Sequence, residues 1–162
     1  MTGYFHAGPR ALQPGDSEAV RALVWAALGV TPYVDRVTEL LTAAERGDPE
    51  TRALVIERDG TVAALALYGP VAGAAHTWQL SMVLTAPRVD LREVGNAIIE
   101  GVTAHARADG ARLLVAELPA DAALGRTLTL LRANRFSQEG RIADFYRDGV
   151  ARLFLRRDLD GD

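Results

Sequence analysis

Six residues in the second half of the chain, Leu113–Leu118, form a nearly continuous apolar run between two breaks. Asp109-Gly110 precedes the run and Pro119 follows it, so the segment has the length of a strand and is too short for a buried helix. A strand without polar alternation is typical of a strand that is covered on both faces. The run therefore predicts a sheet with a central strand here and with helices on both sides.

Hydrophobic periodicity and turn residues place the other elements around this strand. Helical spacing is found in four segments, near residues 17–28, 32–46, 90–108 and 121–134. Extended runs are found near residues 10–12, 53–57, 61–68, 77–84, 141–146 and 151–157. Asp59-Gly60 and Asp148-Gly149 are dipeptides typical of hairpin turns. The order β-α-α-β-β-β-α-β-α-β-β predicts one α/β domain over residues 1–162, with a mixed sheet and helices on both faces.

In the strand at 77–84 and in the last strand, the residue pattern predicts which side chains share one face of the sheet. Strict alternation places Trp78, Leu80, Met82 and Leu84 on one face of the first, and Val83 on the other. The last strand alternates Ala151, Leu153 and Leu155 with Arg152, Phe154 and Arg156. We expect it to be an edge strand that presents a phenylalanine, a surface that favours association of two copies.

Composition excludes several classes of protein and of site. The 162 residues are 49% hydrophobic and 24% charged, an ordinary globular balance. The net charge of −3 does not suit nucleic-acid binding, and no apolar run reaches membrane-spanning length. The absence of cysteine and the spacing of three histidines argue against a metal site. The chain opens without a signal-peptide pattern, and all 18 basic residues are arginine, so we expect a cytoplasmic bacterial protein.

The ordered set of elements resembles the GNAT (Gcn5-related N-acetyltransferase) superfamily across essentially the whole chain. The segments that carry the resemblance are Leu80–Leu84 followed by Pro87, Gly95 opening a helix that closes at Gly110, Ala111–Glu117, Leu130–Phe136, and Asp144–Gly149 followed by Leu153–Leu155. The resemblance implies transfer of an acetyl group from acetyl-CoA to the amine of a small molecule. It also implies a homodimer, because members often pair through their terminal strands.

The resemblance implies two cofactor-binding segments. The backbone of Met82, Val83 and Leu84 would pair with the pantetheine arm. The pyrophosphate would lie at a helix N-terminus, where N–H groups and the helix dipole favour an anion. By the resemblance, the residues at this pyrophosphate-binding end of the helix are Arg88, Arg92, Val94, Gly95 and Asn96.

The pyrophosphate loop departs from the family pattern of Gln/Arg-x-x-Gly-x-Gly/Ala. The ungapped frame has Asp90 at the first position and Glu93 at the first glycine, and keeps only Gly95; a frame shifted to Arg92–Ala97 also fits. Asp90 and Glu93 form a capping-box pattern, so their carboxylates would compete with a phosphate for the same N–H groups. Arg88 and Arg92 would offset that repulsion, or the two acids cap the helix and point away.

The catalytic candidates are a carboxylate and a phenol. Glu117 ends the buried strand, where packing against Leu114, Leu118 and Trp78 would favour the protonated form and suit the carboxyl for taking a proton. The alternatives are that Glu117 ends in solvent or pairs with an arginine such as Arg112 or Arg126. The family's tyrosine is replaced by Leu131 and the glycine before Phe136 by Arg135. Tyr146 is the substitute acid, or a packed strand residue with its hydroxyl at the rim.

Four further residues are candidates for binding the acceptor. Trp25 and Tyr33 stand on the two N-terminal helices, which wall the acceptor pocket in the family. His76 precedes the strand at 77–84 and would line the cleft, and Asp144 would bind an amine at the pocket mouth or an arginine of its own hairpin.

Two alternatives to acetyl transfer stay open: acid/base chemistry on a small metabolite without acyl-CoA, and a non-catalytic binding domain.

Overall fold

The computed structural model describes residues 7–161, and the order of its elements is the predicted one. The strands are β1 (Arg10–Ala11), β2 (Arg52–Arg58), β3 (Thr61–Pro70), β4 (Thr77–Thr85), β5 (Leu113–Pro119), β6 (Ser137–Arg147) and β7 (Val150–Asp158). The helices are α1 (Ser17–Leu28), α2 (Val34–Glu45), α3 (Asn96–Ala108) and α4 (Gly125–Ala133). Short turns η1 (Pro14–Asp16), η2 (Leu91–Gly95) and η3 (Ala122–Leu124) precede α1, α3 and α4.

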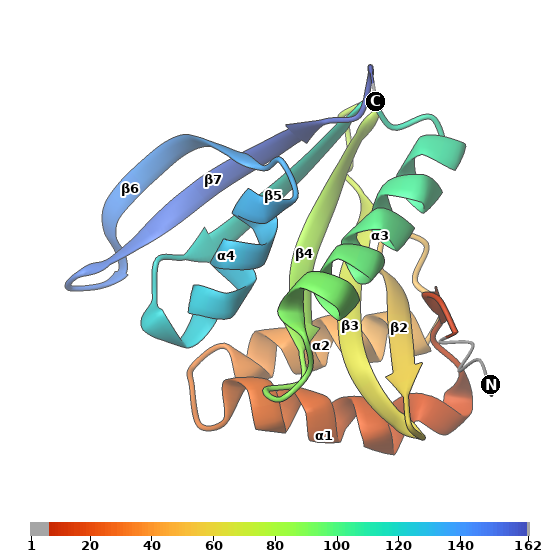
Figure 1. Cartoon of the computed structure of the whole chain (residues 1–162). Helices are drawn as coiled ribbons and strands as arrows, with labels where there is room; N and C mark the ends of the chain where they lie inside the picture. Colours follow the sequence, from red (N-terminus) through yellow and green to blue (C-terminus); the bar gives the residue numbers. More distant parts are fainter. Residues whose placement is uncertain (1–6, 162) are drawn as a thin grey trace.

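The seven strands form one mixed sheet in the order β1-β2-β3-β4-β5-β7-β6, in which only β4 and β5 are parallel. Helices α1 and α2 pack on β2, β3 and β4 from one face, and α3 crosses the same strands from the other (Figure 1). Strand β3 lies between β2 and β4, and its residues 62–69 are all buried. The expected fold class, with helices on both faces, is confirmed.

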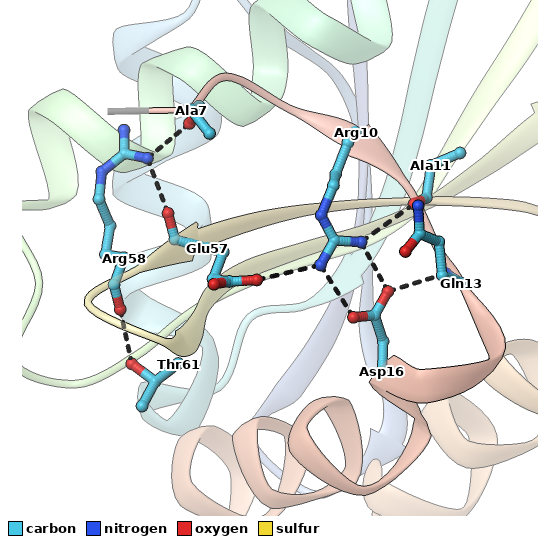
Figure 2. Close-up of polar contacts among 8 residues, drawn as sticks. All are labelled: Ala7, Arg10, Ala11, Gln13, Asp16, Glu57, Arg58 and Thr61. Atoms are coloured by element: carbon cyan, nitrogen blue, oxygen red, sulfur yellow. Dashed lines mark hydrogen bonds and ion pairs between the residues drawn. The ribbon is translucent and has the colours of Figure 1, made fainter. Parts of the chain in front are cut away.

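The N-terminal strand is tied to the sheet by a network of ion pairs (Figure 2). Arg10 donates two hydrogen bonds to the carboxylate of Asp16, at 2.7 and 2.9 Å, and a third to Glu57 at 3.2 Å. The hydrogen bond from Arg10 is the main cause that lowers the pKa of Asp16. The bidentate geometry makes this pair stronger than a single surface contact. It therefore fixes the approach of the chain to α1.

Strand β4 contains a bulge that the alternation did not predict. Leu67 faces Met82 across the β3–β4 ladder, but the next pair is Tyr68 with Leu80, so Ser81 is the extra residue. An extra residue shifts the side-chain alternation by one position. Met82 therefore does not share the buried face of Leu80, and it is half-exposed beside Ser81. The single-face assignment of Trp78, Leu80, Met82 and Leu84 was wrong.

Strand β5 is covered on one face only. Leu114, Ala116 and Leu118 are buried, whereas Leu113, Val115 and Glu117 are half-buried on the opposite face. Helices α1 and α2 cover the sheet on the face where Glu117 lies. They pack on β2–β4 and do not extend across β5. Because side chains alternate along a strand, Glu117 points away from Leu114 and Leu118. The expected packing of Glu117 against these residues was wrong.

The last strand is not an edge strand. Strand β7 pairs with β5 on one side and with β6 on the other, so the sheet ends at β6. The expected alternation of β7 is present, with Ala151, Leu153 and Leu155 buried and Phe154 half-buried. Apart from half-buried Gly140, every residue of β6 is exposed, including Ile142 and Phe145. The edge expected at β7 is therefore at β6.

The expected helix from Asp90 begins later as an α-helix. Residues Leu91–Gly95 form a π-helical turn, and α3 starts at Asn96. Gly95 lets α4 pack closely here: a Cβ on it would lie 2.5 Å from Cδ1 of Leu130, so the Leu130 side chain would have to move. None of the helices in residues 7–161 combines the length and apolar character that a membrane crossing needs.

Candidate active site

Strands β4 and β5 are adjacent at their starts and then separate. Their ladder consists of Thr77 with Leu113, Trp78 with Leu114 and Gln79 with Val115, and no further pair follows. Figure 1 shows the two strands together near the C-terminus and diverging toward the other end. Residues 80–84 therefore belong to an internal strand that separates from the strand of Val115.

A cavity of about 580 Å³ lies at this divergence. One side comes from one face of α2 and the residues before it, and the other from four strands. The lining residues are Pro32, Tyr33, Arg36, Val37 and Leu40 on the α2 side, and Gln79, Ser81, Met82, Glu117, Pro119, Tyr146, Arg147 and Arg152 opposite. The bulge at Ser81 turns both Ser81 and Met82 toward it. Among residues 7–161 no cluster of three or more His, Asp or Glu side chains could hold a metal ion.

Glu117 is held in the cavity wall by an arginine. Its carboxylate forms an ion pair with Arg152, and the two side chains are 30% and 29% exposed. The guanidinium of Arg152 also lies over the rings of Phe145 and Phe154, with its carbon 4.8 and 5.3 Å from their centroids. These contacts fix the position of both partners. The arginine partner is therefore Arg152, and the suggestion of Arg112 or Arg126 was wrong.

A second polar group closes the other end of the cavity. Tyr33 donates a hydrogen bond to Asp121 at 2.6 Å, and Arg147 contacts both, at 3.2 Å to the tyrosine oxygen and 2.6 Å to the carboxylate. The hydrogen bond from Tyr33 is the main cause that lowers the pKa of Asp121 to about 2. Burial, and then the bond to Asp121, raises the pKa of Tyr33. These three residues join α2, the loop before α4 and the end of β6.

Tyr146 lines the same cavity from β6. Its ring meets Tyr33 edge-on at 6.4 Å between centroids and Phe145 at 5.0 Å. Burial raises the pKa of the Tyr146 hydroxyl, and nearby Tyr33 adds to the effect. The hydroxyl is therefore protonated at neutral pH and has a proton to donate. Glu117, Tyr146 and Tyr33, three of the residues proposed from the sequence, thus lie around one cavity.

Three other candidates do not line the cavity. Trp25 is 60% exposed on α1. His76 precedes the paired end of β4, and its Nδ1 lies 2.9 Å from the carbonyl oxygen of Gly110. Asp144 accepts a hydrogen bond from the N–H of Gly149 at 2.8 Å, so its carboxylate shapes the β6–β7 turn and does not bind an arginine there. None of the three is among the residues that line the cavity, and their acceptor-binding roles stay predictions.

The diverging end of β4 contacts α4. Met82 lines the cavity, whereas Val83 and Leu84 are buried. The hydroxyl of Thr127 donates to the carbonyl oxygen of Val83 at 2.9 Å. This carbonyl is one of the backbone groups expected to pair with a pantetheine arm, and α4 already occupies one of its acceptor positions.

The loop after β4 combines the two expected carboxylates with several arginines. Asp90 accepts a hydrogen bond from the N–H of Glu93 at 2.9 Å, as a capping residue does. Glu93 does not reach back to complete a capping box; its carboxylate lies 3.7 Å from the guanidinium of Arg58. Arg126 of α4 donates to Thr85 and to the carbonyl oxygens of the loop, at 3.3 to 3.5 Å.

The five residues that the family resemblance assigns to pyrophosphate binding divide into two groups. Arg88 and Arg92 are exposed and can contact a ligand. Val94 is buried, Gly95 packs against Leu130, and Asn96 accepts a hydrogen bond from the side-chain amide of Asn134 at 2.8 Å. The residues of this second group lie where the start of α3 packs against α4.

Several residues that line the cavity were not predicted from the sequence. Arg36 and Leu40 follow Tyr33 at helical spacing on one face of α2, a signal that the sequence contains. Arg152 lies on the same face of the sheet as Glu117, because Glu117 faces Phe154 across the β5–β7 ladder. Ser81 gave no signal, because a bulge is not visible in hydrophobic alternation.

The fold has many solved counterparts, although scans of protein-family models and of curated proteins find no match to the sequence. A GNAT-family structure from Desulfovibrio desulfuricans is 26% identical with a TM-score of 0.82, over 93% of this chain and 98% of that one. The chain belongs to the GNAT superfamily. Among further structures with the GNAT fold is the ribosomal-protein-alanine N-acetyltransferase of Brucella melitensis, with 22% identity and a TM-score of 0.71, covering 93% of this chain and 98% of that chain.

A third GNAT-fold structure contains a bound cofactor. YncA of Salmonella typhimurium, solved with acetyl-CoA, is 19% identical with a TM-score of 0.72, covering 95% of this chain and 94% of that chain. The resemblance inferred from the ordered sequence segments is confirmed at the level of superfamily by the 26% identical structure, and all three structures share the fold.

Proposed function

We propose that this protein transfers an acetyl group from acetyl-CoA to the amine of a small molecule held in the cavity between α2 and the diverging strands. The observation that carries the proposal is the separation of β4 and β5 after three paired positions. It opens a space in which a carboxylate, Glu117, and a protonated phenol, Tyr146, are both present. Solved structures of the same fold that are named acetyltransferases support the same reaction class.

The charges around the loop after β4 are compatible with a pyrophosphate. Glu93 is balanced by Arg58, and Arg88, Arg92 and Arg126 add positive charge against the single carboxylate of Asp90. Arg126 together with the loop after β4 would hold the phosphates, and the unpaired end of β4 would lie along the pantetheine arm. When bound, acetyl-CoA supplies the acetyl thioester.

The chain's own groups move the protons. Glu117 accepts a proton from the amine, and Arg152 holds the Glu117 carboxylate in the cavity wall. Tyr146 holds a proton at its hydroxyl for the leaving sulfur. The apolar side chains of Val37, Leu40 and Met82 displace water from the space between them.

Thermal unfolding with and without acetyl-CoA tests the cofactor half of the proposal. A ligand at a hundredfold excess over its Kd stabilises the native state by about 2.7 kcal/mol, which raises Tm by several degrees for a chain of this size. We expect acetyl-CoA to raise Tm and adenosine, which lacks the pyrophosphate and pantetheine, to leave it unchanged. No shift at millimolar acetyl-CoA would overturn the assignment of this cofactor.

Acid/base chemistry without acyl-CoA is the second candidate function. The hydrogen bond from the N–H of Glu93 to Asp90 favours it, because a carboxylate already occupies one of the groups that a phosphate needs. Glu117 and Tyr146 would then act on a small metabolite as base and acid. Absence of an acetyl-CoA shift, combined with stabilisation by a metabolite, would support this second function.

A further inference from the structure

Among the residues that line the cavity, positively charged side chains outnumber negative ones. Arg36, Arg147 and Arg152 contribute guanidinium groups, and Glu117 contributes the one carboxylate. An amine without any other charged group would meet mostly like charge here. The charge balance therefore restricts the acceptors that the cavity suits.

Two of the three arginines are occupied by partly buried partners. Arg152 pairs with Glu117, which is 30% exposed, and Arg147 pairs with Asp121, which is 13% exposed. Each pair also contacts aromatic side chains, Phe145 and Phe154 for the first and Tyr33 for the second. Breaking either pair would leave a partly buried carboxylate without its partner, which is unfavourable.

Arg36 differs from the other two. Its partner is Glu39, one turn along α2 at 3.2 Å, and the two side chains are 71% and 69% exposed. A solvent-exposed pair at this spacing contributes only a few tenths of a kcal/mol. Glu39 belongs to a separate groove with Arg46 and is not among the residues that line the cavity. Arg36 can therefore exchange Glu39 for an anion in the cavity with little loss of stability.

We propose that the acceptor is an amine that also carries an anionic group, a carboxylate or a phosphate monoester, and that Arg36 is the specificity-determining residue that binds this group. The proposal rests on the acetyl-transfer function proposed above. Val37, Leu40 and Met82 give the cavity its apolar walls, so the remainder of the acceptor is small and mainly apolar.

The test compares acceptors in matched pairs that differ by the anion. The pairs are phenylalanine with phenethylamine, 4-aminobutyrate with butylamine, and phosphoethanolamine with ethanolamine. Turnover is measured by release of free thiol from acetyl-CoA, and acceptor affinity is measured separately by calorimetry. We expect a lower KM and a lower Kd for the anionic member of at least one pair, and which pair responds distinguishes a carboxylate from a phosphate.

Arg36→Gln should raise KM and Kd for the anionic acceptor by roughly 10- to 100-fold, the range for loss of one charge-assisted hydrogen bond. It should leave kcat, and KM for the uncharged partner, nearly unchanged. Arg36→Lys should recover part of the loss because it keeps the charge. Arg46→Gln, at the C-cap of the same helix and outside the cavity, is the matched control and should behave as wild type.

The two proposals fail in different ways. If thiol is released with amines but the uncharged members are preferred, or Arg36→Gln affects both members equally, the inference about Arg36 is wrong and acetyl transfer stands. If no acceptor releases thiol, acetyl transfer is wrong; calorimetric preference for anionic amines that Arg36→Gln removes would then still support anion binding by Arg36, and no such preference would overturn it.

Discussion

The hydroxyl of Tyr33 lies 2.6 Å from the carboxylate of Asp121, although the two residues are far apart in the chain. Tyr33 stands immediately before α2, and Asp121 caps the turn that leads into α4 through the N–H of Ala123. Arg147 at the end of β6 joins the same carboxylate. Three elements that surround the cavity are thus held together at one ionised group, which gives the group a measurable effect on stability.

The stability of the protein should depend on the ionisation of Asp121. Its pKa is lowered from 3.8 to about 2 in the folded state, so the folded chain binds fewer protons than the unfolded chain between these values. The stabilisation is complete above about pH 4 and is lost as the pH falls toward about 2. Asp121→Asn should flatten the dependence of Tm on pH in this range, while Asp35→Asn, an exposed carboxylate on α2, should not. Equal slopes in all three proteins would contradict this role.

Removing the charge of Asp90 should strengthen acetyl-CoA binding. An asparagine keeps the hydrogen bond to the N–H of Glu93 and removes a negative charge near the proposed phosphate position. A unit charge about 4 Å away contributes on the order of 1 kcal/mol in water, so Asp90→Asn should lower Kd by roughly fivefold or more by calorimetry. Glu93→Gly should have a smaller effect, because Arg58 already balances Glu93. Unchanged Kd in both variants would place the phosphates elsewhere.

Gly69 at the end of β3 should not tolerate a side chain. A Cβ at this position would lie 1.9 Å from the backbone oxygen of Glu50, so the backbone itself would have to move. Gly69→Ala should reduce the free energy of unfolding by about 3 kcal/mol or more in urea titrations. Gly125→Ala, where no atom lies within 4 Å of the added Cβ, should change it by no more than about 1 kcal/mol. Similar midpoints for the two variants would contradict the packing described here.

We expect the protein to associate as a homodimer through β6 and the open face of the sheet beside it. β6 is the edge of the sheet, and Ile142 and Phe145 on it are 47% and 46% exposed. Edge strands with apolar side chains favour pairing with another chain. Light scattering at micromolar concentration should give twice the mass of one chain, and Ile142→Asp should shift it toward one. A single-chain mass for the wild type would contradict this expectation.

The fold was largely predictable because its elements have clear local signals. The periods of the four helices and the two Asp-Gly turns are properties of neighbouring residues, and so the element order was right. The position of β7 between β5 and β6 is a pairing of distant segments, and its amphipathic pattern suits an edge strand as well as an internal one. The open face of β5 was missed for the same reason, since an apolar strand does not show how far the covering helices extend.

Site residues were predictable where a polar or ionisable residue occupied a distinctive position in the sequence pattern. Glu117 at the end of an apolar run and Tyr146 near a hairpin turn were found in this way, and both line the cavity. The partner of Glu117 was not found, because it depends on the register that sets Glu117 opposite Phe154 and brings Arg152 beside it. His76 and Asp144 were predicted from their type and their place in the chain, and both instead form hydrogen bonds with backbone groups, His76 with distant Gly110 and Asp144 with nearby Gly149.

Release of free thiol from acetyl-CoA, measured with an amine acceptor for the wild type and Glu117→Gln, tests the proposed reaction most directly. Glu139→Gln is the matched control, because this exposed carboxylate on β6 lies outside the cavity. We predict turnover by the wild type and the control, and a kcat lowered by roughly 10²–10⁴ in Glu117→Gln with KM little changed. Tyr146→Phe should lose less, because water can protonate a sulfur of low basicity. No thiol release by the wild type with any amine, or full turnover by Glu117→Gln, would contradict it.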